Sequence, residues 1–305
     1  MWPWLLGAVI ALQSACAHAG SWDYCDAGTA PSAAVQDRLL QVAAITKSEL
    51  DRSGSAVALI SRSGLALQHL GQRYSHAGVS LKTSPLTPWS VRQLYFSCDE
   101  QRPRIFDQGI SGFVMGANDL SEGYVSIVLL PADAGVALEQ TALNGRTALS
   151  LLANTYSANA YVFSQRYQNC NQWLAELLAT AWGDLAAKAE EEPNGAATPR
   201  STAQDWLQAQ GYAPTVLSIG WQPLMWLAAR LRWLHSDDHP TQDLDAAQFR
   251  VSMPQGIESF VQQRYPQATR FELCYTTEHV VVHRGWGAIA TGCMPSAGDE
   301  VTALR

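Results

Sequence analysis

Residues 167–173 read Tyr167-Gln168-Asn169-Cys170-Asn171-Gln172-Trp173 and stand at the start of a predicted helix. After Cys170, apolar residues recur at the spacing of one buried helical face, at Trp173, Leu174, Leu177, Leu178 and Ala181. The helix is expected to run to about Trp182 and to end at Gly183. Cys170 would then lie on the inward side of the first turn, where free backbone N–H groups and the helix dipole favour a thiolate. A cysteine in this position can act as a nucleophile.

The first 19 residues read as a secretion signal. An apolar run from Leu5 to Ala15 is too short to span a bilayer, and Ala17-His18-Ala19 fits a signal-peptidase site before Gly20. A lipoprotein anchored through Cys16 is the less favoured alternative, because Gln13 is a poor residue three positions before a lipidated cysteine. We expect an exported protein, periplasmic or secreted, with no transmembrane span in the mature chain.

The length and net charge of the chain limit the kinds of domain and binding partner that can be expected. The chain has 305 residues, enough for one large domain or for a core with an extension, and its formal net charge is −7. A mildly acidic surface argues against nucleic acid or an anionic membrane as the main partner. His279 and His283 share one strand face and Cys274 faces the other side, so these residues predict no zinc site. We expect no cofactor and no metal.

Five cysteines remain after removal of the signal: Cys25, Cys98, Cys170, Cys274 and Cys293. An odd number in an exported protein indicates disulfide pairs plus one free thiol. The local pattern favours Cys274–Cys293 across a C-terminal hairpin and Cys25–Cys98 between the N-terminal segment and a strand, which leaves Cys170 free. The alternative is that all five are reduced core residues.

The order of predicted elements indicates the fold class. A helix is expected over residues 32–52, followed by strands over 56–61, 76–82, 89–97 and 124–130. Helices follow over 134–141, 146–155, 170–182, 202–210, 221–235 and 254–265, and strands over 270–276 and 279–284. Strands and helices come in blocks, which is typical of an α+β fold with a mostly antiparallel sheet.

A cysteine nucleophile needs a base, and the base needs a third group that orients it. His76 opens a strand as Tyr74-Ser75-His76-Ala77-Gly78, where Gly78 removes a side chain beside the imidazole. A turn near residues 84–85 sets Gln93 or Tyr95 of the next strand across from His76. We take Gln93 as the third residue, because its side-chain carbonyl can accept from the imidazole N–H.

An oxyanion intermediate also needs hydrogen-bond donors. The backbone N–H of Cys170 is one candidate, and Gln165, Tyr167 or Gln168 is expected to supply another or to contact the substrate.

The strings Tyr-Ser-His-Ala-Gly and, later, Asn-Cys-Asn-Gln-Trp resemble the circularly permuted branch of the NlpC-type papain-like superfamily, in which the histidine precedes the cysteine. Residues 73–81, 89–98 and 167–173 are also similar to an exported bacterial family of unknown function. The resemblance implies a papain-like core over residues 20–185, with an antiparallel sheet packed on the helix of the nucleophile. A linker over 186–200 and a mainly helical extension over 201–305, ending in a β-hairpin and packed on the core, would complete the chain.

The resemblance and the residues together predict an exported cysteine hydrolase. Cys170 would attack an amide or ester, His76 would act as base, and Gln93 would orient the imidazole. The expected substrate is a small peptide or acyl compound, either a cell-wall fragment or a lipid acyl group. One alternative is a catalytically silent envelope binding or assembly protein on the same fold. Another is a redox role for Cys170, against which the absence of a C-x-x-C motif counts.

Overall fold

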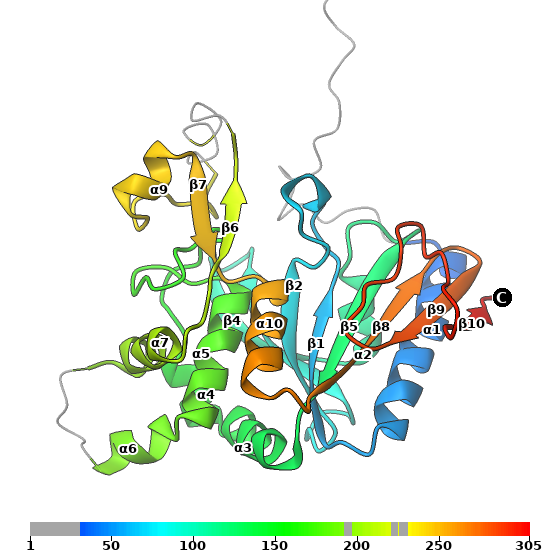
Figure 1. The fold of residues 1–305 in the computed structure, drawn as a ribbon, viewed down its shortest axis with the longest axis horizontal. Helices are drawn as coiled ribbons and strands as arrows, with labels where there is room; N and C mark the ends of the chain where they lie inside the picture. The colour runs from blue at the N-terminus through cyan, green and yellow to red at the C-terminus, as the bar shows by residue number, and fades with distance from the viewer. Residues whose placement is uncertain (1–30, 192–196, 221–224, 226–230) are drawn as a thin grey trace, which may run out of the picture. The chain divides into compact units, whose positions relative to one another are not determined.

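An eight-stranded antiparallel sheet runs through the computed structural model, which describes residues 31–191, 197–220, 225 and 231–305 (Figure 1). Across the sheet the strands follow the order β10-β9-β8-β5-β1-β2-β3-β4. Their bounds are β1 Val57–Arg62, β2 His76–Leu81, β3 Ser90–Ser97, β4 Arg102–Gln108, β5 Gly123–Leu129, β8 Thr269–Tyr275, β9 His279–Arg284 and β10 Glu300–Ala303. A separate two-stranded sheet pairs β6 (Thr215–Ser218) with β7 (Gln248–Val251).

The helices begin and end where the sequence offers suitable caps. Asn169 caps the first turn of α5, with its side chain accepting from the backbone N–H of Gln172, and Gly183 follows the last residue. Ser32 caps α1 in the same way. The helices are α1 Ala33–Arg52, α2 Ile110–Met115, α3 Ala132–Leu143, α4 Gly145–Ser150, α5 Cys170–Trp182, α6 Leu185–Glu191, α7 Pro199–Ala209, α9 Thr241–Asp245 and α10 Pro254–Arg264, with a 3-10 turn η1 at Gln68–Leu70.

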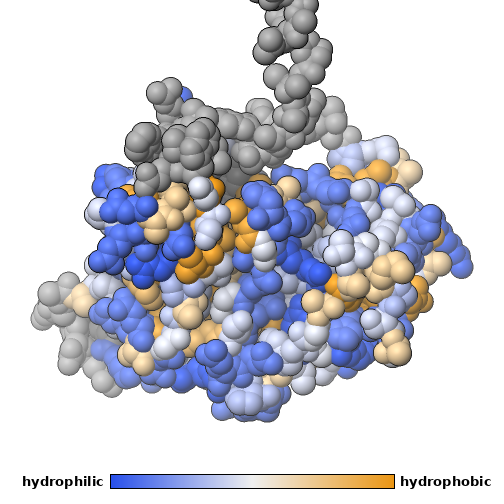
Figure 2. Space-filling model, turned by 45° about the horizontal axis from the view of Figure 1, so that its top comes forward, coloured by the Kyte–Doolittle hydropathy of each residue, from blue (hydrophilic) through white to orange (hydrophobic). Residues whose placement is uncertain are grey.

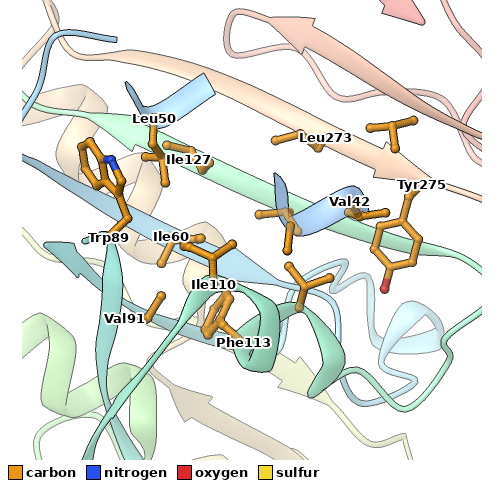
Figure 3. Close-up of a cluster of buried hydrophobic side chains, with 14 of the residues drawn as sticks. Val42, Leu50, Ile60, Trp89, Val91, Ile110, Phe113, Ile127, Leu273 and Tyr275 are labelled. Atoms are coloured by element: carbon orange, nitrogen blue, oxygen red, sulfur yellow. The ribbon is translucent and has the colours of Figure 1, made fainter. Parts of the chain in front are cut away.

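The main core lies between the sheet and the helices α1 and α2. Alternate residues of β1 and β5, such as Ile60 and Ile127, face this side and pack against Leu50 of α1 and Phe113 of α2 (Figure 3). The intervening residues face the other side, where Val57 lies under α3 and where α5 packs against β2, β3 and α3. Helices on both faces explain why β1, β2 and β5 are almost entirely buried.

The predicted division of the chain at residues 186–200 differs from the structure. Residues 31–305 form one compact unit, and β8 pairs with β5 along its whole length. The expected hairpin of β8 and β9 is present, but it continues the central sheet and is not an extension packed on a complete core. The expected linker also carries much of α6. Sequence periodicity detects a hairpin but not the strand beside which it pairs, because that pairing is a long-range contact.

The Cys274–Cys293 disulfide is present and joins β8 to the segment after β9. Cys98 is also disulfide-bonded, and its expected partner Cys25 lies outside the described residues. The expected signal over residues 1–19 and residues 221–224 and 226–230 of the predicted helix 221–235 lie outside them too, and the described residues 231–235 form turns and irregular structure where the helix was expected to continue. Within the described residues, none of the helices has the length and apolar character needed to cross a membrane. Polar residues cover most of the face in Figure 2, with hydrophobic residues in separate patches between them.

Candidate functional site

The N-terminus of α5 is fixed by its capping residue. The Asn169 Oδ1 atom accepts from the Gln172 N–H at 2.7 Å, and its Nδ2 atom donates to the carbonyls of Ala158 and Ser252 at 3.3 and 3.4 Å. The cap therefore satisfies one free N–H of the helix and attaches the turn to two loops. Cys170, the next residue, is held in place by this cap.

Cys170 is a free thiol and is only 6% exposed. Burial raises the pKa of the Cys170 thiol to about 11, although Arg62, the backbone N–H groups of Asn171 and Cys170, and Tyr156 each favour the thiolate. The helix N-terminus thus acts in the expected direction, but the cost of burying a charge is larger. The expectation of a thiolate is wrong for this buried state, in which Cys170 is a neutral thiol at pH 7.

His76 is hydrogen-bonded to Gln93 and not to Tyr95. Its Nε2 atom meets Gln93 Oε1, whereas Tyr95 is 45% exposed and packs on Phe106 of the edge strand β4. The Gln93 amide donates in turn to Gln108 Oε1 at 2.9 Å, an arrangement in which the Gln93 oxygen faces the imidazole. Since Gln93 Oε1 can only accept, His76 carries its proton on Nε2 and keeps its lone pair on Nδ1.

Gly78 makes the contact between these two side chains possible. In the β2–β3 register Val79 pairs with Arg92, so Gly78 lies beside Gln93. A Cβ atom on Gly78 would lie 2.7 Å from Val91 Cγ1, 2.8 Å from the Arg92 carbonyl oxygen and 3.2 Å from Gln93 Cβ. Only glycine leaves the space into which Val91 and Gln93 lean.

His76 itself is held neutral. The pKa of the His76 imidazole is lowered to about 3, mainly by burial and also by the charge of Arg62, while the bond to Gln93 acts to raise it. Arg62 pairs with His76 across β1 and β2 and lies over the Phe113 ring, 5.4 Å from its centroid. The His76 ring packs against the same Phe113 at 6.0 Å between centroids. The imidazole therefore lies on the sheet face that α1 and α2 cover.

Cys170 and His76 are neighbours through the residues beside them. Asn171 Nδ2 donates to the Ser75 carbonyl at 3.1 Å, which joins the first turn of α5 to the start of β2. Arg62 acts electrostatically on both groups. The two groups make separate hydrogen bonds, His76 with Gln93 and Cys170 with Tyr156. The resting arrangement is thus a thiol at the start of α5 and an oriented neutral imidazole on the sheet face that α1 and α2 cover, joined through the Asn171–Ser75 bond.

The residues expected to line an oxyanion hole are engaged elsewhere in the fold. Gln168 is fully buried; it accepts from the Ala153 N–H and donates to the Leu151 carbonyl and to Glu176. The Gln165 amide bonds to Gln204 of α7 at 2.5 Å. These amides therefore hold the loop before Cys170 and leave the backbone N–H groups of the first turn as the candidate donors.

Tyr167, the third of these residues, faces the C-terminal part of the chain. Its ring stacks on His235 with centroids 4.2 Å apart, and its hydroxyl donates to Asp237 at 3.4 Å. It therefore helps to attach residues 235–237 to the loop before Cys170.

Sequence reasoning did not find Arg62, Tyr156 or Asn171. Asn171 was visible as the residue after the cysteine, but its bond to Ser75 depends on how α5 crosses β2. Arg62 faces His76 only because β1 and β2 pair across a 13-residue loop. Tyr156 lies in an irregular segment, with its ring 5.1 Å from that of Phe96. None of these positions carries a local signal. Within the described residues, no group of three or more His, Cys, Asp or Glu side chains is placed to hold a metal.

Comparison with known proteins identifies a family. No curated protein and no solved structure matches the chain. A family model described as "Uncharacterized protein conserved in bacteria (DUF2145)" matches residues 49–261. The matched region contains β1 to β7, all of α5, and Cys170, His76 and Gln93. The chain belongs to this family of uncharacterized bacterial proteins.

Proposed function

We propose that this protein is an exported cysteine hydrolase with a papain-like core of the circularly permuted NlpC type, which cleaves an amide or ester bond. Cys170 is the nucleophile, His76 is the general base and Gln93 is the residue that positions the base. The substrate is a cell-wall peptide or a lipid acyl group.

The observation that carries the proposal is the His76–Gln93 hydrogen bond. It fixes the tautomer with the lone pair on Nδ1, and a thiol needs a base of this kind to lose its proton during attack. Gln108 accepts from the Gln93 amide and so helps to hold Gln93 against the imidazole. The Asn171–Ser75 bond adds support, because it holds the cysteine helix against the histidine strand.

The steps follow from the protonation states. With the thiol pKa at about 11 and the imidazole pKa at about 3, the resting pair is neutral. His76 Nδ1 takes the thiol proton as the sulfur bonds to the carbonyl carbon, and then returns it to the departing amine or alcohol. The resulting thioester is cleaved by water, from which His76 removes a proton. This releases the acid and restores the thiol. The N–H groups of Cys170 and Asn171 are available to the oxyanion.

The test is detection of the acyl-enzyme. Purified protein is incubated with p-nitrophenyl acetate, and separately with cell-wall digests and phospholipids, and is then analysed by intact-mass and peptide mass spectrometry. We expect one acyl group on Cys170 and product release by the wild type. Cys170→Ala should lose both and Gln93→Leu should slow both. Equal turnover by wild type and Cys170→Ala on all three substrates would refute the hydrolase.

The second candidate is the silent binding or assembly protein. The observation that favours it is that both groups are buried, with pKa values far from 7, and that each bonds to a different partner. Iodoacetamide labelling separates the two functions. A hydrolase must expose its thiol during turnover, so the probe should modify Cys170 faster when p-nitrophenyl acetate is absent than when it is present. A silent protein should give one slow rate under both conditions.

A further inference from the structure

A pocket of about 360 Å³ lies outside the site of Cys170, His76 and Gln93. Its lining includes Arg73 and Tyr74 before β2, Gln255 and Glu258 of α10, Glu272 of β8, and Trp286 after β9. The volume falls in the range of pockets that bind small molecules. Four charged side chains, two of each sign, line it, counting Arg270.

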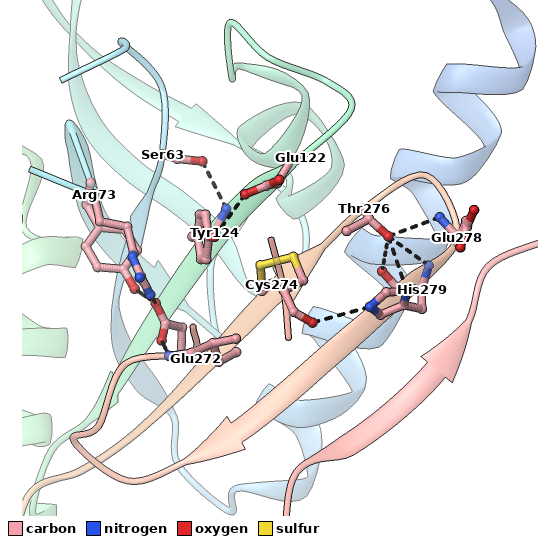
Figure 4. Close-up of a disulfide and its surroundings, with 12 residues drawn as sticks. Ser63, Arg73, Glu122, Tyr124, Glu272, Cys274, Thr276, Glu278 and His279 are labelled. Carbon is pink, nitrogen blue, oxygen red and sulfur yellow. Dashed lines mark hydrogen bonds and ion pairs between the residues drawn. A yellow bond between two sulfur atoms is a disulfide. The ribbon is translucent and has the colours of Figure 1, made fainter. Parts of the chain in front are cut away.

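The donors at the base of this pocket are already used. Arg270, 6% exposed, donates to Ser126, Glu258 and Tyr74 at 2.8, 3.1 and 2.9 Å, and to the Gly287 carbonyl at 2.9 Å. The fully buried Glu272 accepts from Tyr74, from the Ile289 N–H and from Arg73, which meets it beside the Cys274–Cys293 disulfide (Figure 4). The hydrogen bonds of Arg270 and Glu272 are therefore mostly made within the protein, and few of their donors and acceptors remain for a ligand.

The atoms of the pocket that lack a hydrogen-bond partner are acceptors. Glu258 is 8% exposed; Arg270 bonds to its Oε2 and Ser126 also bonds to its carboxylate, but its buried Oε1 has no hydrogen-bond partner. The buried Oε1 of Gln255, one turn earlier on α10, also has none. A buried acceptor without a partner carries a free-energy cost, and the cost is larger for a carboxylate. Burial also raises the pKa of Glu258 while Arg270 opposes this, so a second cation would favour the ionised form.

The chemistry of the walls agrees with a cation. Trp286 and Tyr74 supply aromatic rings, and ammonium groups are attracted to such rings within about 6 Å. The net charge of −7 also favours approach of a positive ligand.

We propose that this pocket binds the primary ammonium group of a small organic ligand, with Glu258 and Gln255 accepting its N–H bonds and Trp286 and Tyr74 covering its carbon atoms. This site requires no turnover at Cys170. Its ligand is defined by one positive, N–H-donating end on an apolar body.

The test uses three probes that share one ring: benzylamine, benzyl alcohol and benzoate. Binding to the full purified protein is measured by isothermal titration calorimetry at pH 7, with ligand-observed NMR for weak complexes. We expect benzylamine to bind at least about tenfold more tightly than the other two, because a hydrogen bond to a buried charge is worth roughly that factor. Glu258→Gln should remove this preference, and Gln255→Met should weaken benzylamine while leaving benzyl alcohol unchanged.

The matched control is Glu278→Gln, the same substitution at an exposed carboxylate, which should bind benzylamine as the wild type does. Near-ultraviolet circular dichroism checks that each variant is folded. If Glu258→Gln fails to fold, Gln255→Met and the three-probe comparison on the wild type decide the matter. Failure of benzylamine to bind below roughly 10 mM, or equal binding of benzylamine and benzyl alcohol, would overturn the proposal. Cys170→Ala should bind benzylamine normally, so loss of hydrolysis and loss of binding can be told apart.

Discussion

The Asn171 side chain donates to the Ser75 carbonyl at 3.1 Å, and so joins the residue after the cysteine to the residue before the histidine. Asn171 is only 2% exposed, and its Nδ2 also lies 4.0 Å from Met253 Sδ. One buried amide thus sets the position of the first turn of α5 relative to the start of β2. A residue with this role is structural, yet it controls the approach of Cys170 and His76.

Asn171→Ala should lower the free energy of unfolding by about 1–3 kcal/mol, because it leaves the part-buried Ser75 carbonyl without this donor. Urea unfolding followed by circular dichroism measures the change. Asn118→Ala, at an exposed asparagine, is the control and should stay within about 0.5 kcal/mol of the wild type. If both variants unfold at the same urea concentration, the bond does not position α5.

His76 should make the fold sensitive to mild acid. The pKa of His76 is lowered from 6.5 to about 3, so between these values the unfolded chain binds a proton that the folded protein does not. This contribution to stability is present above pH 6.5 and is lost as the pH falls toward 3, at about 1.4 kcal/mol per pH unit. His76→Gln should therefore show a flatter decline in unfolding free energy over this range than the wild type. His69→Gln, at an exposed histidine, should follow the wild-type curve, and a wild-type slope in His76→Gln would contradict the low pKa.

Arg200 should be essential for stability through the loop before Cys170. Its guanidinium bonds to the fully buried Glu176 at 3.0 Å and to the carbonyls of Gln165, Ser164 and Tyr167 at 3.0, 2.9 and 3.1 Å. Arg200→Met leaves a buried carboxylate unpaired and should cost about 3–5 kcal/mol in thermal or urea unfolding. Arg102→Met breaks an exposed pair with Glu100 and should cost less than about 1 kcal/mol. Equal effects of the two substitutions would show that the buried network contributes no more to the free energy of unfolding than an exposed ion pair.

A chain ending at residue 200 should not fold. Residues 20–200 lack β8, so β5 would lose the partner with which it pairs from Gly123 to Leu129 and would present an open edge. We expect this fragment to aggregate or to show no cooperative thermal transition, whereas residues 20–305 should show one. A soluble fragment with a sharp transition would instead support an independent core ending near residue 185.

Local signals predicted the helix of Cys170 and the hairpin that carries His76 and Gln93 better than they predicted the rest of the sheet. The Cys170 helix runs over the expected residues 170–182, because its cap, its apolar stripe and its final glycine all lie within the helix. The strand of His76 and its neighbour β3 were also found, since a short connection between alternating segments defines a hairpin. The His76–Gln93 pair followed from that hairpin.

Elements whose pattern depends on tertiary contacts escaped prediction. The edge strand β4 contains Pro103 between two arginines and shows no alternation, and α2 is too short to display a periodicity. The pKa of Cys170 depends on burial by segments that are distant in sequence, so helix position alone gave the wrong protonation state. The pairing of β8 with β5 also depends on a contact between residues that are distant in sequence.

The pairing of β8 with β5 limits the order in which the protein can fold. β5 and β8 are separated by 139 residues along the chain, so β5 finds one of its two neighbours only after nearly the whole polypeptide is available. Contacts of such high sequence separation slow folding, because the entropy of closing a long loop is lost before the strands can pair. An unfinished chain would carry β5 with one side open to other strands.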